Sequence, residues 1–391
     1  MSIVDLHTLN PQSDLGRRLH AHVAYLASPE LKGRKPGTPG NRKAAEYIAA
    51  EFRKAGLEPL PSLGGYSQAI APAIGDNLMG LRRPSAQASP QWILIGAHYD
   101  HLGGSYLGAD DNAAAVSILI ETARLLGALR YHPILFVAFN SEEAPYIRTQ
   151  LMGSQYFADH LPRELGSLSQ CHAAVVMDLV GGVHWEPLRE TIFAAGAEMT
   201  AGLYRRVKEA SPDLQPGTER SRGESLAIRP VGLHLVEEIP LLGRVPFSDY
   251  DAFRNAGVPF VFLSAGRTPR YHQPTDLPET LHYERMASTV GWLQSLATLT
   301  DEDRAPYRFD KNRIEFHDEV ETFRPLVAHA ADDAMKIPGT SGLSLWKMQQ
   351  DLEWIQRLNA AHPGSEDIRR LERLSIRMQC LLADFSGCFL I

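Results

Sequence analysis

Four short apolar runs separated by helical patterns constrain the fold of this chain more than any other feature. Nearly every position in each run is apolar, which is typical of a strand that is covered on both faces. The runs are residues 92–97, 134–139, 173–177 and 258–263. Apolar residues at helical spacing predict helices between and after them, at 113–129, 153–161 and 283–299. Strands that alternate with helices predict an α/β fold, with a mainly parallel twisted sheet flanked by helices on both faces.

The remaining segments indicate how the chain is divided into domains. Helices are expected at 16–30 and 41–56, and extended segments at 66–82. The C-terminal part is richer in charge, and apolar stripes predict two helices there, at 343–361 and 365–385. We therefore expect a catalytic domain over 1–300 and a helical C-terminal extension over 301–391. The extension either packs on the body as a hairpin or mediates homo-oligomerisation.

Composition excludes several classes of protein. The 391 residues include 39 Lys and Arg against 46 Asp and Glu, a net charge of −7, and the positive charges do not cluster. Nucleic acid is therefore not an expected partner, and no apolar run is long enough to span a bilayer. Three scattered cysteines and the absence of a visible signal peptide predict a cytoplasmic protein. The alternative is an exported protein whose leader is absent from this chain.

Metal-binding side chains follow the ends of these strands. His98, Glu142, Glu143 and Asp178 each come just after an apolar run. Because ligands bind beyond the carboxyl ends of parallel strands, these side chains are expected to lie together. Five candidate ligands result: His98, one aspartate of the pair at 110–111, one glutamate of the pair at 142–143, Asp178 and His272. Nitrogen and oxygen ligands in that number suit two metal ions that share a bridging carboxylate, with one carboxylate left for acid–base work.

The ordered motifs resemble those of the M28-type metallopeptidases, a family of two-zinc aminopeptidases. The resemblance rests on His98-Tyr-Asp-His-Leu-Gly, Gly108-Ala-Asp-Asp-Asn-Ala, Glu142-Glu143 and Tyr271-His-Gln-Pro-Thr-Asp, and it covers about residues 19–299. Several motifs in one order are far more specific than any of them alone. The resemblance implies a zinc exopeptidase-like fold of the phosphorylase/hydrolase-like kind.

The resemblance also implies roles for single residues. His98, Glu143, Asp178 and His272 would be terminal ligands of two Zn²⁺ ions, with Mn²⁺ or Co²⁺ as alternatives, and Asp110 would bridge the ions. The peptide bond from Asp110 to Asp111 would be cis. The other histidines, His101 among them, match no metal motif and are expected to have structural roles.

The implied activity is removal of N-terminal residues from peptides through a metal-bridging hydroxide. Glu142 is the expected general base, and Asp100 is expected to accept a hydrogen bond from the imidazole of His98. Asp249 is a second such candidate, behind His272, and Tyr271 is expected to line the pocket or steady the oxyanion. Residues 144–152 are expected to form an extra loop that could narrow the pocket and place Arg148 near a substrate carboxylate or backbone.

Alternatives stay open at this point. A glutaminyl-cyclase-like acyltransferase acting on N-terminal Gln or Glu would share this fold but resembles a one-metal site. A carboxypeptidase or an amide deacylase could use the same two metals. A peptide-binding pseudoenzyme would need no proton shuttle, so the presence of Glu142 together with all five candidate ligands argues against it.

Overall fold

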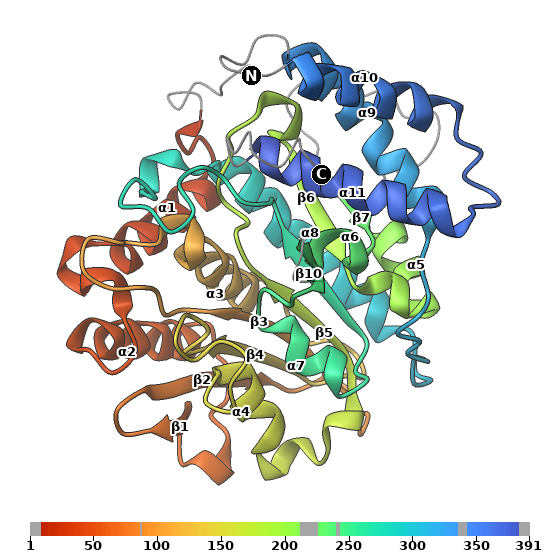
Figure 1. The fold of residues 1–391 in the computed structure, drawn as a ribbon. Coiled ribbons are helices and arrows are strands. Elements are labelled where there is room, and N and C mark those ends of the chain that lie inside the picture. Colours follow the sequence, from red (N-terminus) through yellow and green to blue (C-terminus); the bar gives the residue numbers. More distant parts are fainter. Residues whose placement is uncertain (1–8, 87, 212–225, 240–242, 335–341, 383–391) are drawn as a thin grey trace.

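The protein is described from a computed structural model that covers residues 9–86, 88–211, 226–239, 243–334 and 342–382. Eight strands form one sheet in the order β1-β2-β4-β3-β5-β10-β6-β7 (Figure 1). The strands are β1 Ser67–Ala71, β2 Gly75–Arg82, β3 Trp92–His98, β4 Ile134–Phe139, β5 Cys171–Met177, β6 Thr191–Ala195, β7 Ala227–Val231 and β10 Phe260–Ser264. A two-residue pair, β8 Glu238–Ile239 and β9 Gly243–Arg244, lies apart from this sheet.

The four central strands are parallel. β3 pairs with β4 and β5, and β5 pairs with β10, all in parallel register. The pairings β1 with β2, β2 with β4, and β10 with β6 are antiparallel, whereas β6 and β7 are parallel. The four apolar runs of the sequence are therefore the four central strands, and the predicted mixed α/β fold is confirmed.

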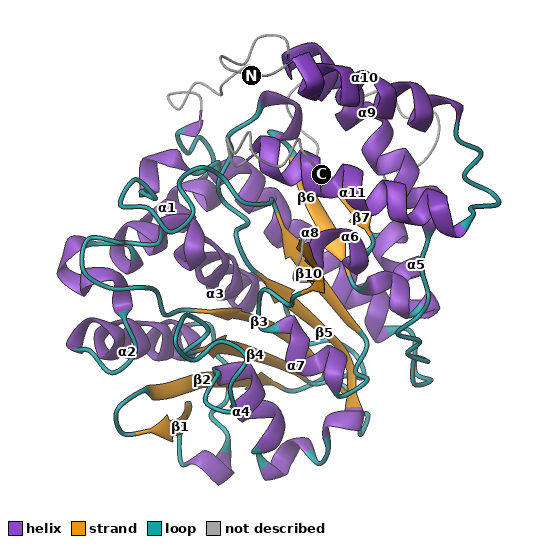
Figure 2. Cartoon of the chain, in the orientation of Figure 1, coloured by secondary structure: helices purple, strands orange, loops and turns teal. Residues whose placement is uncertain are grey.

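Helices cover both faces of the sheet (Figure 2). Alternate strand residues face opposite layers, so that Ile93 and Ile95 belong to one apolar cluster whereas Trp92 and Leu94 belong to the other. The first cluster includes residues from α1 Asp14–Leu26, α2 Pro39–Lys54, α3 Ala115–Leu125, α5 Ala201–Glu209 and α8 Tyr283–Asp301. The second includes residues from α4 Gly153–Asp159, α6 Leu233–Glu237, α7 Tyr250–Asn255, α9 Phe316–Ala334, α10 Gly342–Arg357 and α11 Ser365–Leu382.

Local signals fix where the first two helices begin. The hydroxyl of Ser13 accepts a hydrogen bond from the backbone N–H of Gly16 at the start of α1. Thr38 does the same for Asn41 at the start of α2, where Pro39 occupies the first helical position. Such caps satisfy N–H groups that have no partner inside the helix.

The C-terminal part contains three helices where the sequence predicted two. Helix α9, which contains Pro325, packs on β7, and α10 and α11 pack on α9. Strands β6 and β7 and helix α5 also lie in a region that the sequence left without assigned elements. None of the described helices is both long and apolar enough to cross a membrane. The end of the predicted helix 365–385 lies outside the described residues.

Candidate metal centre

The carboxyl ends of the parallel strands bring the candidate residues together. His98 is the last residue of β3, Asp178 directly follows β5, and Glu142 and Glu143 lie shortly after β4. All four side chains are buried. The carboxylate of Asp100 holds the turn after β4, because its two oxygens accept the backbone N–H groups of Glu142 at 3.0 Å and Glu143 at 3.2 Å.

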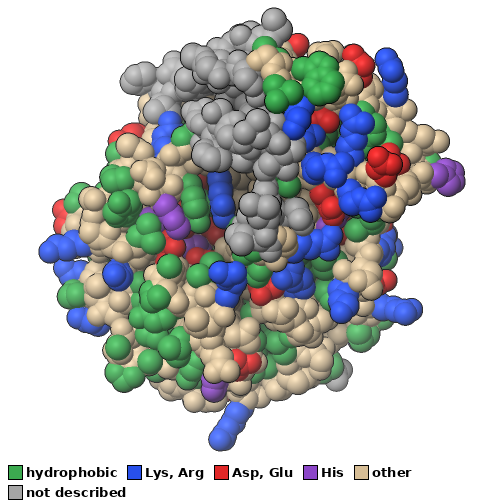
Figure 3. Space-filling model, in the orientation of Figure 1, with side chains coloured by type: hydrophobic (Ala, Val, Ile, Leu, Met, Phe, Trp, Pro, Cys, Tyr) green, Lys and Arg blue, Asp and Glu red, His purple; other side chains and the backbone are tan. Residues whose placement is uncertain are grey.

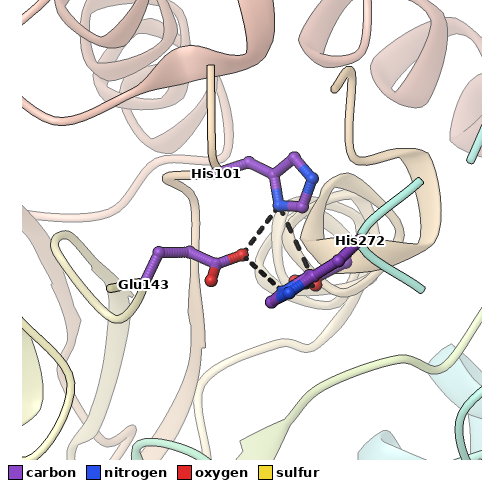
Figure 4. A group of neighbouring side chains, drawn as sticks. His101, Glu143 and His272 are labelled. Atoms are coloured by element: carbon purple, nitrogen blue, oxygen red, sulfur yellow. Dashed lines mark hydrogen bonds and ion pairs between the residues drawn. The ribbon is translucent and has the colours of Figure 1, made fainter. Parts of the chain in front are cut away.

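One group of possible ligands consists of His101, Asp111, Glu143 and His272. Oε1 of Glu143 lies 2.8 Å from Nδ1 of His101 and 3.2 Å from Nε2 of His272. Nε2 of His272 lies 3.1 Å from Oδ2 of Asp111. Figure 4 shows both imidazoles and the Glu143 carboxylate directed at a common space.

A second group consists of His98, Asp111 and Asp178. Nε2 of His98 lies 3.4 Å from Oδ1 of Asp178 and 3.5 Å from Oδ1 of Asp111. The two oxygens of Asp111 thus face different groups, Oδ1 toward His98 and Oδ2 toward His272. A carboxylate in this position can bridge two metal ions.

The contact geometry of His272 fits a bound cation, whereas Nδ1 of His101 makes a direct hydrogen bond to Glu143 at 2.8 Å. Nε2 of His272 is buried and lies within ion-pair distance of two carboxylates, yet neither contact has hydrogen-bond geometry. Ligand atoms around one metal ion lie close together without forming hydrogen bonds to one another, whereas atoms that interact directly have hydrogen-bond angles. Grouped buried carboxylates are also costly without a compensating positive charge. Two imidazoles with two carboxylates, and one imidazole with two carboxylates, suit zinc.

Asp110, which the resemblance gives as the bridge, has a different place. Its Oδ1 accepts hydrogen bonds from the backbone N–H groups of Gly181 and Gly182, both at 2.8 Å, and it belongs to neither ligand group. Asp111 is the residue that both groups share, so it would be the bridge if two metal ions were bound. The cis peptide bond is likewise one position further along, between Asp111 and Asn112.

His101 was expected to be structural and lies instead in the first ligand group. Its spacing of three residues after His98 is the signal that could have identified it. The expected hydrogen bond from His98 to the carboxylate of Asp100 is replaced by a contact of Nδ1 with the backbone oxygen of Asp100, at 3.3 Å. The Asp100 carboxylate is 3.7 Å from that nitrogen.

Two further residues that the sequence analysis did not single out hold the ligand loop. The carboxylate of Asp276 accepts the backbone N–H groups of Asp110 at 2.8 Å and Asp111 at 3.1 Å. The buried guanidinium of Arg34 donates to the backbone oxygens of Tyr99 at 2.8 Å and Gly108 at 2.9 Å. Asp276 ends the Tyr271–Asp276 motif and was therefore adjacent to a recognised signal, whereas no signal in the sequence pointed to Arg34.

Glu142 lies beside the second group without belonging to it. Its Oε2 is 3.9 Å from Nε2 of His98, and its Oε1 is buried without a hydrogen-bond partner. Burial raises the pKa of Glu142 well above its ordinary value; the charge of His98 opposes this and that of Asp178 adds to it. Burial also raises the pKa of Asp249 to about 7, and the charge of His98 opposes the shift. Asp249 was expected to lie behind His272, and it is the charge of His98 that acts on it.

Tyr271 contacts one of the candidate ligands, whereas Arg148 lines a cavity that none of those ligands lines. The ring of Tyr271 stacks on the imidazole of His272. Arg148 lines a cavity together with Met152, Pro246 and Ser248. The space-filling view shows histidine and acidic side chains in a hollow at the surface (Figure 3).

Comparisons with known proteins agree with this geometry. The sequence model of peptidase family M28 matches residues 77–295. Aminopeptidase YwaD of Bacillus subtilis is 26% identical over 268 residues, which span 66% of this chain and 50% of that protein.

Two solved structures share the fold. BSAP, a zinc aminopeptidase from Bacillus subtilis, superposes with a TM-score of 0.55 at 14% identity, covering 77% of this chain and 100% of that one. A glutaminyl cyclase from Bacteroides thetaiotaomicron superposes with a TM-score of 0.52 at 16% identity, covering 74% of this chain and 98% of that one. At these identities the two likenesses establish the fold alone.

Proposed function

Because the chain belongs to peptidase family M28, we propose that it is a two-zinc aminopeptidase that removes N-terminal residues from peptides. The observation that carries the proposal is the pair of buried His/Asp/Glu groups that share Asp111. His98 and Asp178 would hold one ion, and His101, Glu143 and His272 the other. When bound, the ions would act as Lewis acids on the scissile carbonyl and acidify the attacking water.

Glu142 is the group best placed to move the proton. Its carboxylate is buried beside the second ligand group, and one oxygen has no hydrogen-bond partner. It would accept a proton from the attacking water and then donate it to the departing amine. Since burial favours the protonated carboxyl, the raised pKa of Glu142 helps it to act as a proton donor in the second step.

The charge of the site favours a substrate with a free amine. Glu142 and Asp249 are buried near one another and burial raises the pKa of both, so a positively charged amine of the substrate is the partner that would stabilise their charged forms. Such a pair attracts the positively charged N-terminus of a peptide more than its C-terminal carboxylate. This supports an aminopeptidase over a carboxypeptidase.

The experiment that tests the proposal combines a metal count with two assays. Bound metal per chain would be measured by elemental analysis, alongside hydrolysis of aminoacyl amides and cyclisation of a peptide with N-terminal glutamine. We expect two zinc ions, and amide hydrolysis that a chelator abolishes. One zinc ion with cyclisation would identify a cyclase instead, and no turnover would contradict an enzymatic role.

Two adjacent glutamates provide a matched pair of variants. Glu142→Gln should keep both metal ions and lower kcat by about 10²–10⁴-fold, because only the proton shuttle is lost. Glu143→Gln should lose metal from the first group, because Glu143 is one of its four candidate ligands. If Glu142→Gln hydrolyses aminoacyl amides at the wild-type rate, the proposed mechanism is wrong.

A further inference from the structure

A stack of four side chains leads from the metal centre to the protein surface. The imidazole of His272 and the ring of Tyr271 have centroids 3.9 Å apart, with 18° between their planes. The guanidinium carbon of Arg267 lies 4.7 Å from the centroid of Tyr271 and 4.5 Å from that of Phe247. Because the imidazole already covers one face of Tyr271, the guanidinium occupies the other face. Arg267 is therefore held between two aromatic rings.

The guanidinium of Arg267 lies at the surface of the described structure. Arg267 is exposed, and no carboxylate in the described parts of the chain pairs with it. Stacking on rings fixes the plane of a guanidinium and leaves its in-plane N–H groups available. The same loop contains Arg270, whose Nη1 is buried without a hydrogen-bond partner. In-plane guanidinium donors match the two oxygens of a carboxylate.

We propose that Arg267 binds a carboxylate of the substrate, on the first or second residue after the scissile bond. This inference rests on the proposed aminopeptidase function and names its substrate class, short peptides with a free terminal carboxylate. Two stacking steps, of 4.7 Å and 3.9 Å, join the guanidinium to the imidazole of His272. Together the two steps span less than about 9 Å, of which a guanidinium–carboxylate hydrogen bond itself takes about 2.8 Å. An extended peptide advances roughly 3.3–3.6 Å per residue, so up to two residues cover the remainder.

The surrounding charge explains why a cation is needed at this point. The whole chain carries a net charge of −7. A substrate carboxylate that approaches without a partner is repelled by such surroundings. In a longer peptide the terminal carboxylate lies beyond Arg267, so the contact is lost. Dipeptides and tripeptides are therefore the expected substrates.

The test compares leucylglycine with leucylglycinamide, in which the terminal carboxylate is an uncharged amide. The metal-loaded wild-type enzyme should have a KM for the acid about two- to fivefold below that for the amide, a modest ratio because Arg267 is exposed. In Arg267→Gln the ratio of the two KM values should fall toward one. The effect should be on KM and not on kcat, because the contact is made equally in the bound substrate and in the transition state. Arg267→Lys should give an intermediate ratio, since it keeps the charge but not the planar fork.

Arg304 supplies the matched control, because its guanidinium carbon lies 4.8 Å from the ring of Tyr131, away from the metal centre. Arg304→Gln should keep the wild-type KM ratio. The inference is overturned if wild type does not distinguish acid from amide, or if Arg267→Gln keeps the distinction. A further substrate would carry its carboxylate on an aspartate side chain and have an amidated terminus. If the KM ratio depends on Arg267 only for that substrate, the preference for a terminal carboxylate is overturned. Failure of wild type to hydrolyse either substrate would instead contradict the proposed function, and this inference with it.

Discussion

At the scale of single residues, the centre depends on which of two neighbouring aspartates faces the metals. Asp111 offers one oxygen to each ligand group, whereas Asp110 turns away and accepts two backbone N–H groups. Both side chains are buried, so burial does not distinguish them. The difference lies in the backbone that presents them. The N–H groups of both residues are held by Asp276.

Replacing each aspartate by alanine should therefore have a different effect. Asp111→Ala should reduce bound zinc in both groups and abolish hydrolysis, because the shared ligand is lost. Asp110→Ala should keep two zinc ions but lower the free energy of unfolding by about 1–3 kcal/mol, because two buried N–H groups lose their acceptor. Elemental analysis and denaturant unfolding of the two variants check this. Equal zinc loss in both would contradict the assignment of Asp111 as the shared residue.

The sequence predicts residue types at the site better than it predicts their roles. His98, Glu143, Asp178 and His272 lie in the ligand groups, as their positions after strands suggested. The Asp-Asp pair could not be resolved from sequence, because both residues follow the same glycine turn. Arg34 was also beyond reach, since its function depends on backbone oxygens far along the chain. Such long-range backbone contacts leave no local pattern.

At the scale of elements, one histidine joins three helices. Nδ1 of His234 in α6 lies 3.0 Å from Oε1 of Glu372 in α11, and Nε2 lies 3.2 Å from Oε2 of Glu319 in α9. Glu372 also pairs with Arg244 at 2.9 Å. Burial lowers the pKa of His234, but the two carboxylates outweigh it, so that the pKa is raised above its ordinary 6.5. The charged imidazole therefore links the C-terminal helices to the body.

This arrangement predicts a pH-dependent stability. A histidine with a raised pKa in the folded state stabilises fully below its unfolded pKa, and the contribution is lost as the pH rises through the folded pKa. The denaturant midpoint of His234→Gln should therefore fall below that of wild type most strongly at about pH 6, and the gap should narrow toward about pH 9. His160→Gln, at an exposed histidine, should show no such trend. If the difference between the two denaturant midpoints grows as the pH rises, the charged His234 does not stabilise the contact between the three helices.

The elements that the sequence predicted are those with a continuous apolar signal. The central strands β3, β4, β5 and β10 are apolar throughout, and their positions were expected. Strand β7 contains an arginine and a proline, Arg229 and Pro230, which obscure the pattern. Helix α9 contains Pro325, which ordinarily argues against a helix interior. Packing against β7 outweighs that local preference.

At the scale of the whole molecule, the C-terminal helices and the sheet share one apolar cluster. Val320, Val327 and Leu371 belong to the same cluster as Leu94, Val176 and Phe260 of the central strands. Burial of each such side chain contributes about 1.5–3 kcal/mol. Several of them together equal the net stability of a typical domain, about 5–15 kcal/mol.

A chain that ends after residue 310 should therefore fail to unfold cooperatively on heating, because α9 to α11 no longer cover this face. In the full chain, Val327→Ala should lower the melting temperature, whereas Glu321→Ala on the exposed side of the same helix should not. Calorimetry of the three proteins provides the measurement. A truncated chain with a sharp transition at the wild-type temperature would show that the catalytic domain is independent of the extension.

The order of strands in the sheet also bears on how the protein is made. β5 lies next to β10 in the sheet, although about eighty residues separate them along the chain. During synthesis, β5 therefore has no neighbour on that side until residue 264 has left the ribosome. Its seven residues are all buried in the finished protein, so the growing chain exposes an apolar edge. His272 follows β10 by only a few residues, so the gap between β5 and β6 in the sheet and the metal centre are both filled at nearly the same moment of translation.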